Sequence, residues 1–151
     1  MSTAEIDIDA AVICDDVRRE VTGKAILIGV WPLELTVPNY PTELFFCFHV
    51  EGAVIQSGQI EPRLVVRDEV GGTLFDSDVT AKMEPGQFVK GRFSIDFNVV
   101  FAATRSGDVE FIVTMGGASL VAAKRRIELL DVLKKEREAE RATLSDNGPA
   151  S

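Results

Sequence analysis

Apolar and polar residues alternate along most of the chain, and this alternation predicts a protein built of β-strands. The most regular stretch runs from Arg92 to Phe101. One face of this stretch is entirely apolar and carries Phe93, Ile95, Phe97, Val99 and Phe101. Because successive side chains of a strand point to opposite faces, the pattern is typical of a strand that covers a core on one side.

Similar runs recur at short intervals, and turns containing Gly or Pro separate them. Gly71-Gly72, Pro85-Gly86 and Gly116-Gly117 mark three of these turns. Glu51 to Gly58 is expected as a loop, and Gln59 to Asp68 alternates as a single strand. About eight strands follow without the intervening helices that a parallel α/β fold requires. We therefore expect a single all-β domain over residues 10–130, a Greek-key β-sandwich of the immunoglobulin-like kind.

The stretch from Ala11 to Trp31 predicts the opening hairpin of this domain. Gly23 lies in a polar turn and tolerates the positive φ that such turns use. The returning strand, Lys24 to Trp31, is apolar on both faces. This pattern predicts a central strand that is covered on both sides. Residues 33–37 lie between prolines and predict a short edge strand in a crossing from one sheet to the other.

The two ends of the chain differ in composition from the domain. Residues 1–9 are polar and are expected to be flexible, although Ile6 and Ile8 suit an extension of the first strand. Residues 131–151 begin with DVLKKEREAERATLS, which is rich in helix formers, and predict a short exposed helix followed by a disordered end. This tail is either solvated or a helix for partner docking or self-association.

The opening residues also carry a family resemblance. Cys14, Asp15, Asp16, Val17 and Arg18 are followed by Gly23-Lys24 and then by Leu27-Ile28-Gly29-Val30. This spacing resembles the opening of a family of small bacterial all-β proteins classed as a domain of unknown function. The resemblance implies a compact β-sandwich and assigns no activity. The charged tail departs from the family pattern.

Charge and composition argue against several classes of partner. The net charge is -8 and the sequence pI is about 4.7, whereas nucleic acids and anionic membranes require clustered Lys and Arg. The one basic run, Lys124-Arg125-Arg126, lies on a predicted strand and is interpreted as solvated or paired with the charged tail, with an anion-binding patch as the alternative. No apolar run approaches the ~20 residues that a membrane helix needs, and no signal peptide opens the chain. These observations predict a cytoplasmic protein.

The residues that most often carry chemistry are few. Cys14 and Cys47 lie in predicted strands and suit small buried apolar side chains, with a disulfide or a metal pair as the alternative. His49 is the only histidine and lies among phenylalanines, so we expect a hydrogen-bonded structural role. No nucleophile, phosphate-binding or dinucleotide motif is present. The sequence therefore predicts no enzyme activity and no cofactor.

Two pairs of aspartates are the remaining candidates for a site. Asp15 and Asp16 are adjacent, so on a strand they point to opposite faces, and Arg18, Arg19 or Lys24 is the expected ionic partner. Asp76 and Asp78 are two residues apart and share a face. Carboxylates gathered at one end of a sandwich can bind calcium, which gives a second hypothesis for these four residues.

These observations favour a non-enzymatic binding module that meets a protein partner through loops at one end or through an exposed edge strand. The alternative is a β-sandwich that binds calcium or a small ligand through its Asp-rich segments. The candidate binding or structural residues are Asp15, Asp16, Arg18, Lys24, Asp76 and Asp78.

Overall fold

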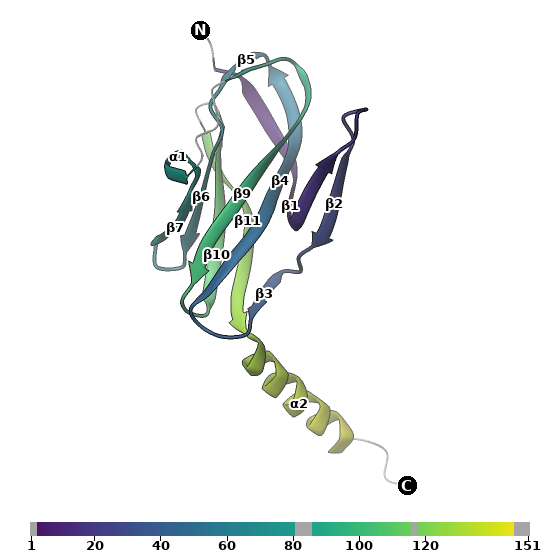
Figure 1. Ribbon diagram of the computed structural model, residues 1–151, viewed down its shortest axis with the longest axis vertical. Coiled ribbons are helices and arrows are strands. Elements are labelled where there is room, and N and C mark those ends of the chain that lie inside the picture. Colours follow the sequence, from purple (N-terminus) through teal and green to yellow (C-terminus); the bar gives the residue numbers. More distant parts are fainter. Residues whose placement is uncertain (1–2, 81–85, 116–117, 147–151) are drawn as a thin grey trace.

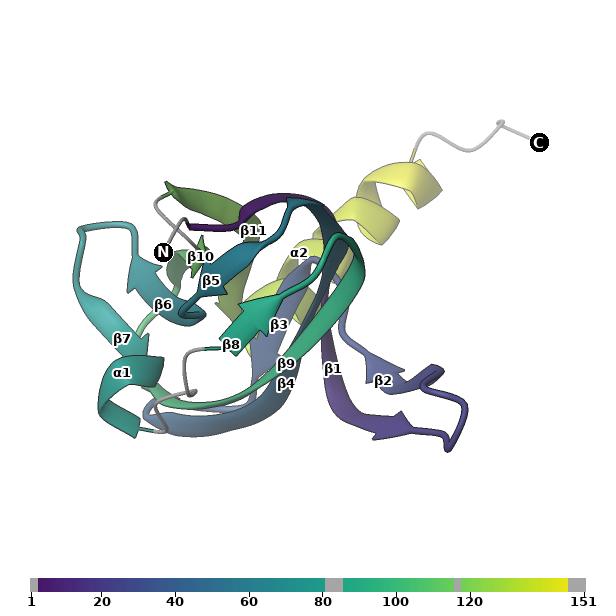
Figure 2. The ribbon, with the colours of Figure 1, turned by 90° about the horizontal axis from the view of Figure 1, so that it is seen from above.

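Two β-sheets pack face to face in the computed structural model, which describes residues 3–80, 86–115 and 118–146 (Figures 1 and 2). The four-stranded sheet contains, in spatial order, β2 (Ala25–Val30), β1 (Glu5–Arg19), β4 (Thr42–Gln56) and β9 (Gly91–Ala103). The five-stranded sheet contains β3 (Glu34–Val37), β11 (Ala118–Leu129), β10 (Gly107–Met115), β6 (Arg63–Asp68) and β7 (Thr73–Asp76). The all-β sandwich expected from the sequence is confirmed.

Smaller elements complete the fold. β5 (Gly58–Ile60) and β8 (Gly86–Phe88) form a two-stranded sheet, and a short helix, α1 (Ser77–Thr80), follows β7. The second helix, α2 (Leu130–Asp146), follows β11 directly and leaves the sandwich at one end (Figure 1). No helix in the described part of the chain is long and apolar enough to cross a membrane.

The core lies between the inward faces of the two sheets. The alternation of β9 is reproduced in full, because its five predicted inward side chains are all buried. Aromatic rings from both sheets meet at the centre, where Phe48 of β4 stacks on Phe111 of β10 with ring centroids 4.9 Å apart. Burying large apolar side chains contributes about 1.5–3 kcal/mol each, so this shared core holds the sheets together.

Long-range pairing sets the order of the strands. β4 pairs with β1 on one side and with β9 on the other, both antiparallel. β3 pairs with β11 in parallel, and its residues Leu35 and Val37 are buried. The segment between β2 and β3 therefore crosses from one sheet to the other, as the prolines around residues 33–37 predicted.

Three expectations about strand limits are corrected. The stretch from Glu51 to Gln56, expected as a loop, continues β4. The single strand expected over residues 59–68 is split into β5 and β6 on either side of Glu61-Pro62, because proline cannot donate to a ladder. The described chain holds eleven strands, where about eight were expected.

The flexible N-terminus expected over residues 1–9 is also corrected. β1 begins at Glu5, and its first half pairs with β4. Ile6 and Ile8 pack against the core, and Ala4 is buried. The alternation of these isoleucines with acidic residues therefore marks a half-buried strand. At the other end α2 confirms the predicted helix, whereas the expected disordered end from Asp146 onward lies, beyond that residue, outside the described residues.

Candidate functional site

The hairpin formed by β1 and β2 stands out from the sandwich (Figures 1 and 2). Its turn is closed by two backbone hydrogen bonds, from the N–H of Glu20 to the Lys24 carbonyl (2.9 Å) and from the N–H of Gly23 to the Glu20 carbonyl (2.8 Å). Gly23 has φ +87, in the left-handed region that glycine enters without steric cost. The hairpin turn predicted at this glycine is therefore present.

The hairpin leaves the sheet because β1 changes partners along its length. From Glu5 to Cys14, β1 pairs with β4, whereas residues 15–19 have only β2 beside them. β2 pairs with β1 alone, so it is an edge strand. The prediction that Lys24 to Trp31 forms a central strand covered on both sides is wrong.

The apolar side chains of β2 are consequently on the surface. Ile26, Ile28 and Val30 are 41%, 39% and 62% exposed, and we call these three residues the β2 surface. Ile26 and Ile28 lie opposite Arg18 and Asp16 of β1, so the Cα register places these two on one face. No charged residue or proline occurs between Ala25 and Val30.

A hydrogen-bonded network ties the base of this hairpin to the sheet. Arg19 Nη2 donates to Asp96 Oδ2 of β9 (2.9 Å), and Asp96 Oδ1 lies 2.5 Å from Nδ1 of His49. The other ring nitrogen, Nε2, lies 2.9 Å from Glu51 Oε1. His49 is only 1% exposed. Each of these carboxylates can accept a hydrogen bond from a ring N–H of His49.

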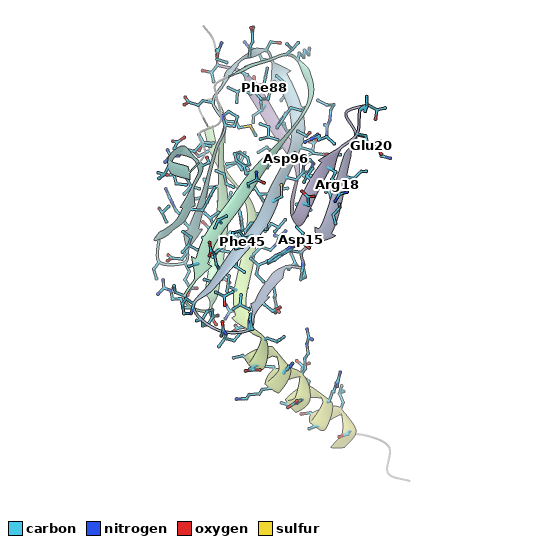
Figure 3. The ribbon with its side chains drawn as sticks, in the orientation of Figure 1. Asp15, Arg18, Glu20, Phe45, Phe88 and Asp96 are labelled. Atoms are coloured by element: carbon cyan, nitrogen blue, oxygen red, sulfur yellow. The ribbon has the colours of Figure 1, made fainter. Side chains whose placement is uncertain are left out.

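His49 therefore joins β4 to β9 and, through Asp96, to the end of β1. Figure 3 shows Asp96 on the sheet and Arg18 and Glu20 on the hairpin. The expected structural role of His49 agrees with these contacts. Its acidic partners were missed in the sequence, because Asp96 is 47 residues away and only the register of β4 with β9 brings the two side by side.

Cys14 and Cys47 lie opposite each other on β1 and β4. Both are buried and both are free thiols. Burial raises the pKa of Cys14, and burial together with the Asp96 carboxylate raises the pKa of Cys47 to about 12. The interpretation of both as small buried side chains agrees with this geometry.

The structure separates Asp15 from Asp16. Asp15 Oδ1 accepts a hydrogen bond from Nε1 of Trp31 (2.6 Å), and its side chain lies over Gly29, where a Cβ would come within 2.2 Å of Asp15 Oδ2. Asp16 points to the other face, where Arg18 Nε is 3.5 Å from its Oδ2. The ion pair is exposed, and exposed pairs contribute little stability.

Lys24 lies in a cleft between the hairpin and the sheet. The cleft has a volume of about 440 Å³, and its charged lining comprises Lys24, Arg19, Arg92 and Glu51. Arg19 is bound to Asp96, and Arg92 is bound to Asp9. The cleft therefore carries cations that are largely compensated by neighbouring carboxylates.

Asp76 and Asp78 lie on the opposite side of the sandwich, at the end of β7 and in α1. Both contact one guanidinium, with Arg63 Nη2 2.7 Å from Asp76 Oδ2 and Arg63 Nε 3.0 Å from Asp78 Oδ2. The hydrogen bond from Arg63 lowers the pKa of Asp76. The four aspartates are thus not brought together.

Within residues 3–80, 86–115 and 118–146, no group of three or more His, Cys, Asp or Glu side chains is placed to hold a metal ion. The calcium hypothesis stays a prediction.

Comparison with solved structures finds a likeness for this fold. No protein-family model matches the chain, and no curated protein matches it significantly. Among solved structures it is similar to the crystal structure of the C-terminal domain of wzt, with a TM-score of 0.54, 13% identity, and coverage of 85% of this chain and 75% of that chain. At this identity the likeness shows the fold alone. The resemblance of the opening residues to a bacterial family stays a prediction.

Proposed function

We propose that the chain is a non-enzymatic interaction module of the bacterial cytoplasm that binds an extended segment of a partner protein along β2. The proposal rests on two features of β2: its apolar side chains are exposed, and one side of its backbone pairs with no strand in the described part of the chain. Exposed apolar residues that occur singly are ordinary, but three close together on an edge strand form a surface suited to another strand.

The backbone of β2 supports this mode of binding. Lys24 directs its carbonyl toward β1, where it accepts from Glu20. Because backbone groups alternate in direction along an antiparallel strand, Ala25 and Leu27 direct theirs toward the free edge. An added strand can hydrogen-bond to these groups while its side chains meet the β2 surface.

The side chains of β2 define the chemistry of the partner. Proteins commonly protect sheet edges with lysine, proline or inward-pointing charge, and β2 has neither a charge nor a proline. A segment with apolar residues at alternate positions would cover Ile26, Ile28 and Val30. The proposed partner is therefore a protein with an extended, alternately apolar segment.

The test compares lysine at two similarly exposed apolar positions. Ile28→Lys places a charge in the β2 surface, and Val121→Lys on β11 is the matched control, because Val121 is 45% exposed. A photo-crosslinking residue at position 26 identifies the bound protein and the attached segment, and a peptide copying that segment is then titrated. We expect Ile28→Lys to weaken peptide binding about tenfold or more, as loss of one buried isoleucine implies.

The control variant should bind the peptide like the unmodified chain. The proposal is wrong if the peptide binds Ile28→Lys with unchanged affinity, or if the crosslinked segment lacks alternating apolar residues. Circular dichroism of both variants separates lost binding from lost folding.

A further inference from the structure

The opposite edge of the same sheet is formed by β9, which is long and regular. All thirteen of its residues pair with β4, from Gly91 opposite Val54 to Ala103 opposite Thr42, without any shift of register. Within the described residues no strand pairs with its other side, and no backbone hydrogen bond outside the sheets involves it. A continuous row of backbone donors and acceptors is therefore available.

β9 lacks the usual protection of an exposed edge. Proteins block such edges with proline, lysine, bulges or short strands, and β9 has none of these features. Its two charged residues, Arg92 and Asp96, are already engaged within the chain by Asp9 and by Arg19 and His49. The edge is thus both unblocked and nearly neutral.

We propose that β9 pairs in antiparallel fashion with β9 of a second copy of this chain, about a two-fold axis at Phe97. Phe97 is the midpoint of the strand, so this register overlaps all thirteen residues of both strands. The two four-stranded sheets would then form one continuous sheet of eight strands. This dimer surface is separate from the β2 surface and does not depend on the proposed function.

The outward side chains of β9 are complementary to themselves in this register. Asp96 of one copy lies opposite Asn98 of the other, Ser94 opposite Val100, and Arg92 opposite Ala102. Asn98 is exposed, so its side-chain amide can donate a hydrogen bond to the facing carboxylate. A register moved by two residues on one strand would set Asp96 against Asp96, which is unfavourable.

The size of the contact indicates a reversible dimer. Thirteen residues at ~3.4 Å each give a pairing ~44 Å long, with about a dozen backbone hydrogen bonds. A single-strand contact lies near the lower limit of stable interfaces, about 1,000 Å² in total. We therefore expect association that depends on protein concentration.

The test uses charge of both signs at one position, measured by sedimentation velocity over a wide range of protein concentration. Asn98→Asp sets like charges opposite each other twice in each dimer and should raise the dimer dissociation constant about tenfold. Asn98→Lys sets opposite charges together and should leave it unchanged or lower it. Val21→Asp and Val21→Lys, at a fully exposed turn residue, control for net charge and should not differ from the unmodified chain.

A second measurement covers the case in which Asn98→Asp fails to fold. In the proposed register two Asn98→Cys side chains lie diagonally across the axis, within reach of a short bis-maleimide, whereas Val21→Cys side chains do not. Efficient crosslinking of Asn98→Cys alone supports the proposal. A chain that is monomeric at all concentrations, or a dimer insensitive to both Asn98 charges, overturns it. Either result leaves the test of β2 unaffected, because that test measures peptide binding.

Discussion

At the scale of single residues, burial decides what the two cysteines do. Cys14 Sγ lies 3.8 Å from the Cys47 carbonyl oxygen, and neither thiol has access to solvent beyond a few per cent. The thiolate is the reactive form, and a pKa of about 12 for Cys47 leaves little thiolate at neutral pH. Both thiols are therefore protected from reaction, because reagents cannot reach them and because they are rarely ionised.

We expect both thiols to react slowly with an aromatic disulfide reagent at pH 8. The rate in the folded chain should be at least about a hundredfold below that of free cysteine, because burial blocks the reagent and lowers the fraction of thiolate. The release of the coloured thiol from the reagent measures this rate. In denaturant, both cysteines of the same protein should react rapidly. Fast reaction of the folded chain would contradict this and would mean that β1 opens from β4.

Residue-level predictions succeeded where the cause is local. The aspartates at 15 and 16 point to opposite faces because they are neighbours on a strand, and His49 makes hydrogen bonds because a buried imidazole requires them. The hydrogen-bond and ion-pair partners of these side chains could not be predicted from the sequence. Arg63 binds Asp76 from a strand thirteen residues earlier in the chain, and that pairing depends on the register of β6 with β7.

At the scale of elements, β2 and β9 show what alternation can and cannot reveal. The pattern of β9 has one apolar face, and that face is buried. β2 is apolar on both faces, a pattern shared by central strands and by edge strands with an exposed apolar side. Its edge position follows from the partner change of β1 after Cys14, which no local pattern records.

The helix α2 allows a test of the predicted tail. Its apolar side chains Leu130, Val132 and Leu144 are exposed, and it contacts β11, the strand that precedes it. A chain ending at Leu130 should therefore keep its melting temperature within about 2 °C, since surface contacts carry little stability. Its helical circular dichroism should fall.

The same truncated chain also tests self-association through the tail. Unchanged sedimentation of the truncated chain is expected if α2 is solvated and copies associate through β9. Loss of association on truncation would instead assign the contact to α2.

At the scale of the whole molecule, the sequence predicted the class of fold but not the order of strands. Period-two alternation and turn glycines are local and identify β-strands. The pairing of β1 with β4, of β4 with β9 and of β3 with β11 joins segments far apart in the chain. Those pairings follow from the shared core, where side chains of both sheets such as Phe48 and Phe111 meet.

This arrangement predicts a gradient of amide hydrogen exchange across the molecule. β4 is flanked by strands on both sides, and its inward residues Phe46, Phe48 and Val50 are buried. Its amides should exchange slowest, near the limit set by global unfolding, whereas β2 should exchange far faster through local opening of the hairpin. Mass spectrometry of peptides from timed exchange measures both. Equal protection of β2 and β4 would contradict this picture.

The positions of the first and last strands have a mechanical consequence. β1 begins at one end of the sandwich, and β11 ends at the other, where α2 leaves (Figure 1). Tension applied between these two points would pull β1 along its own axis, so that the hydrogen bonds to β4 would be loaded together in shear. Loading in shear requires many bonds to break at once, whereas peeling breaks them one by one. The pairing of β1 with β4 would therefore resist a pull along the long axis of the sandwich more strongly than it would resist peeling.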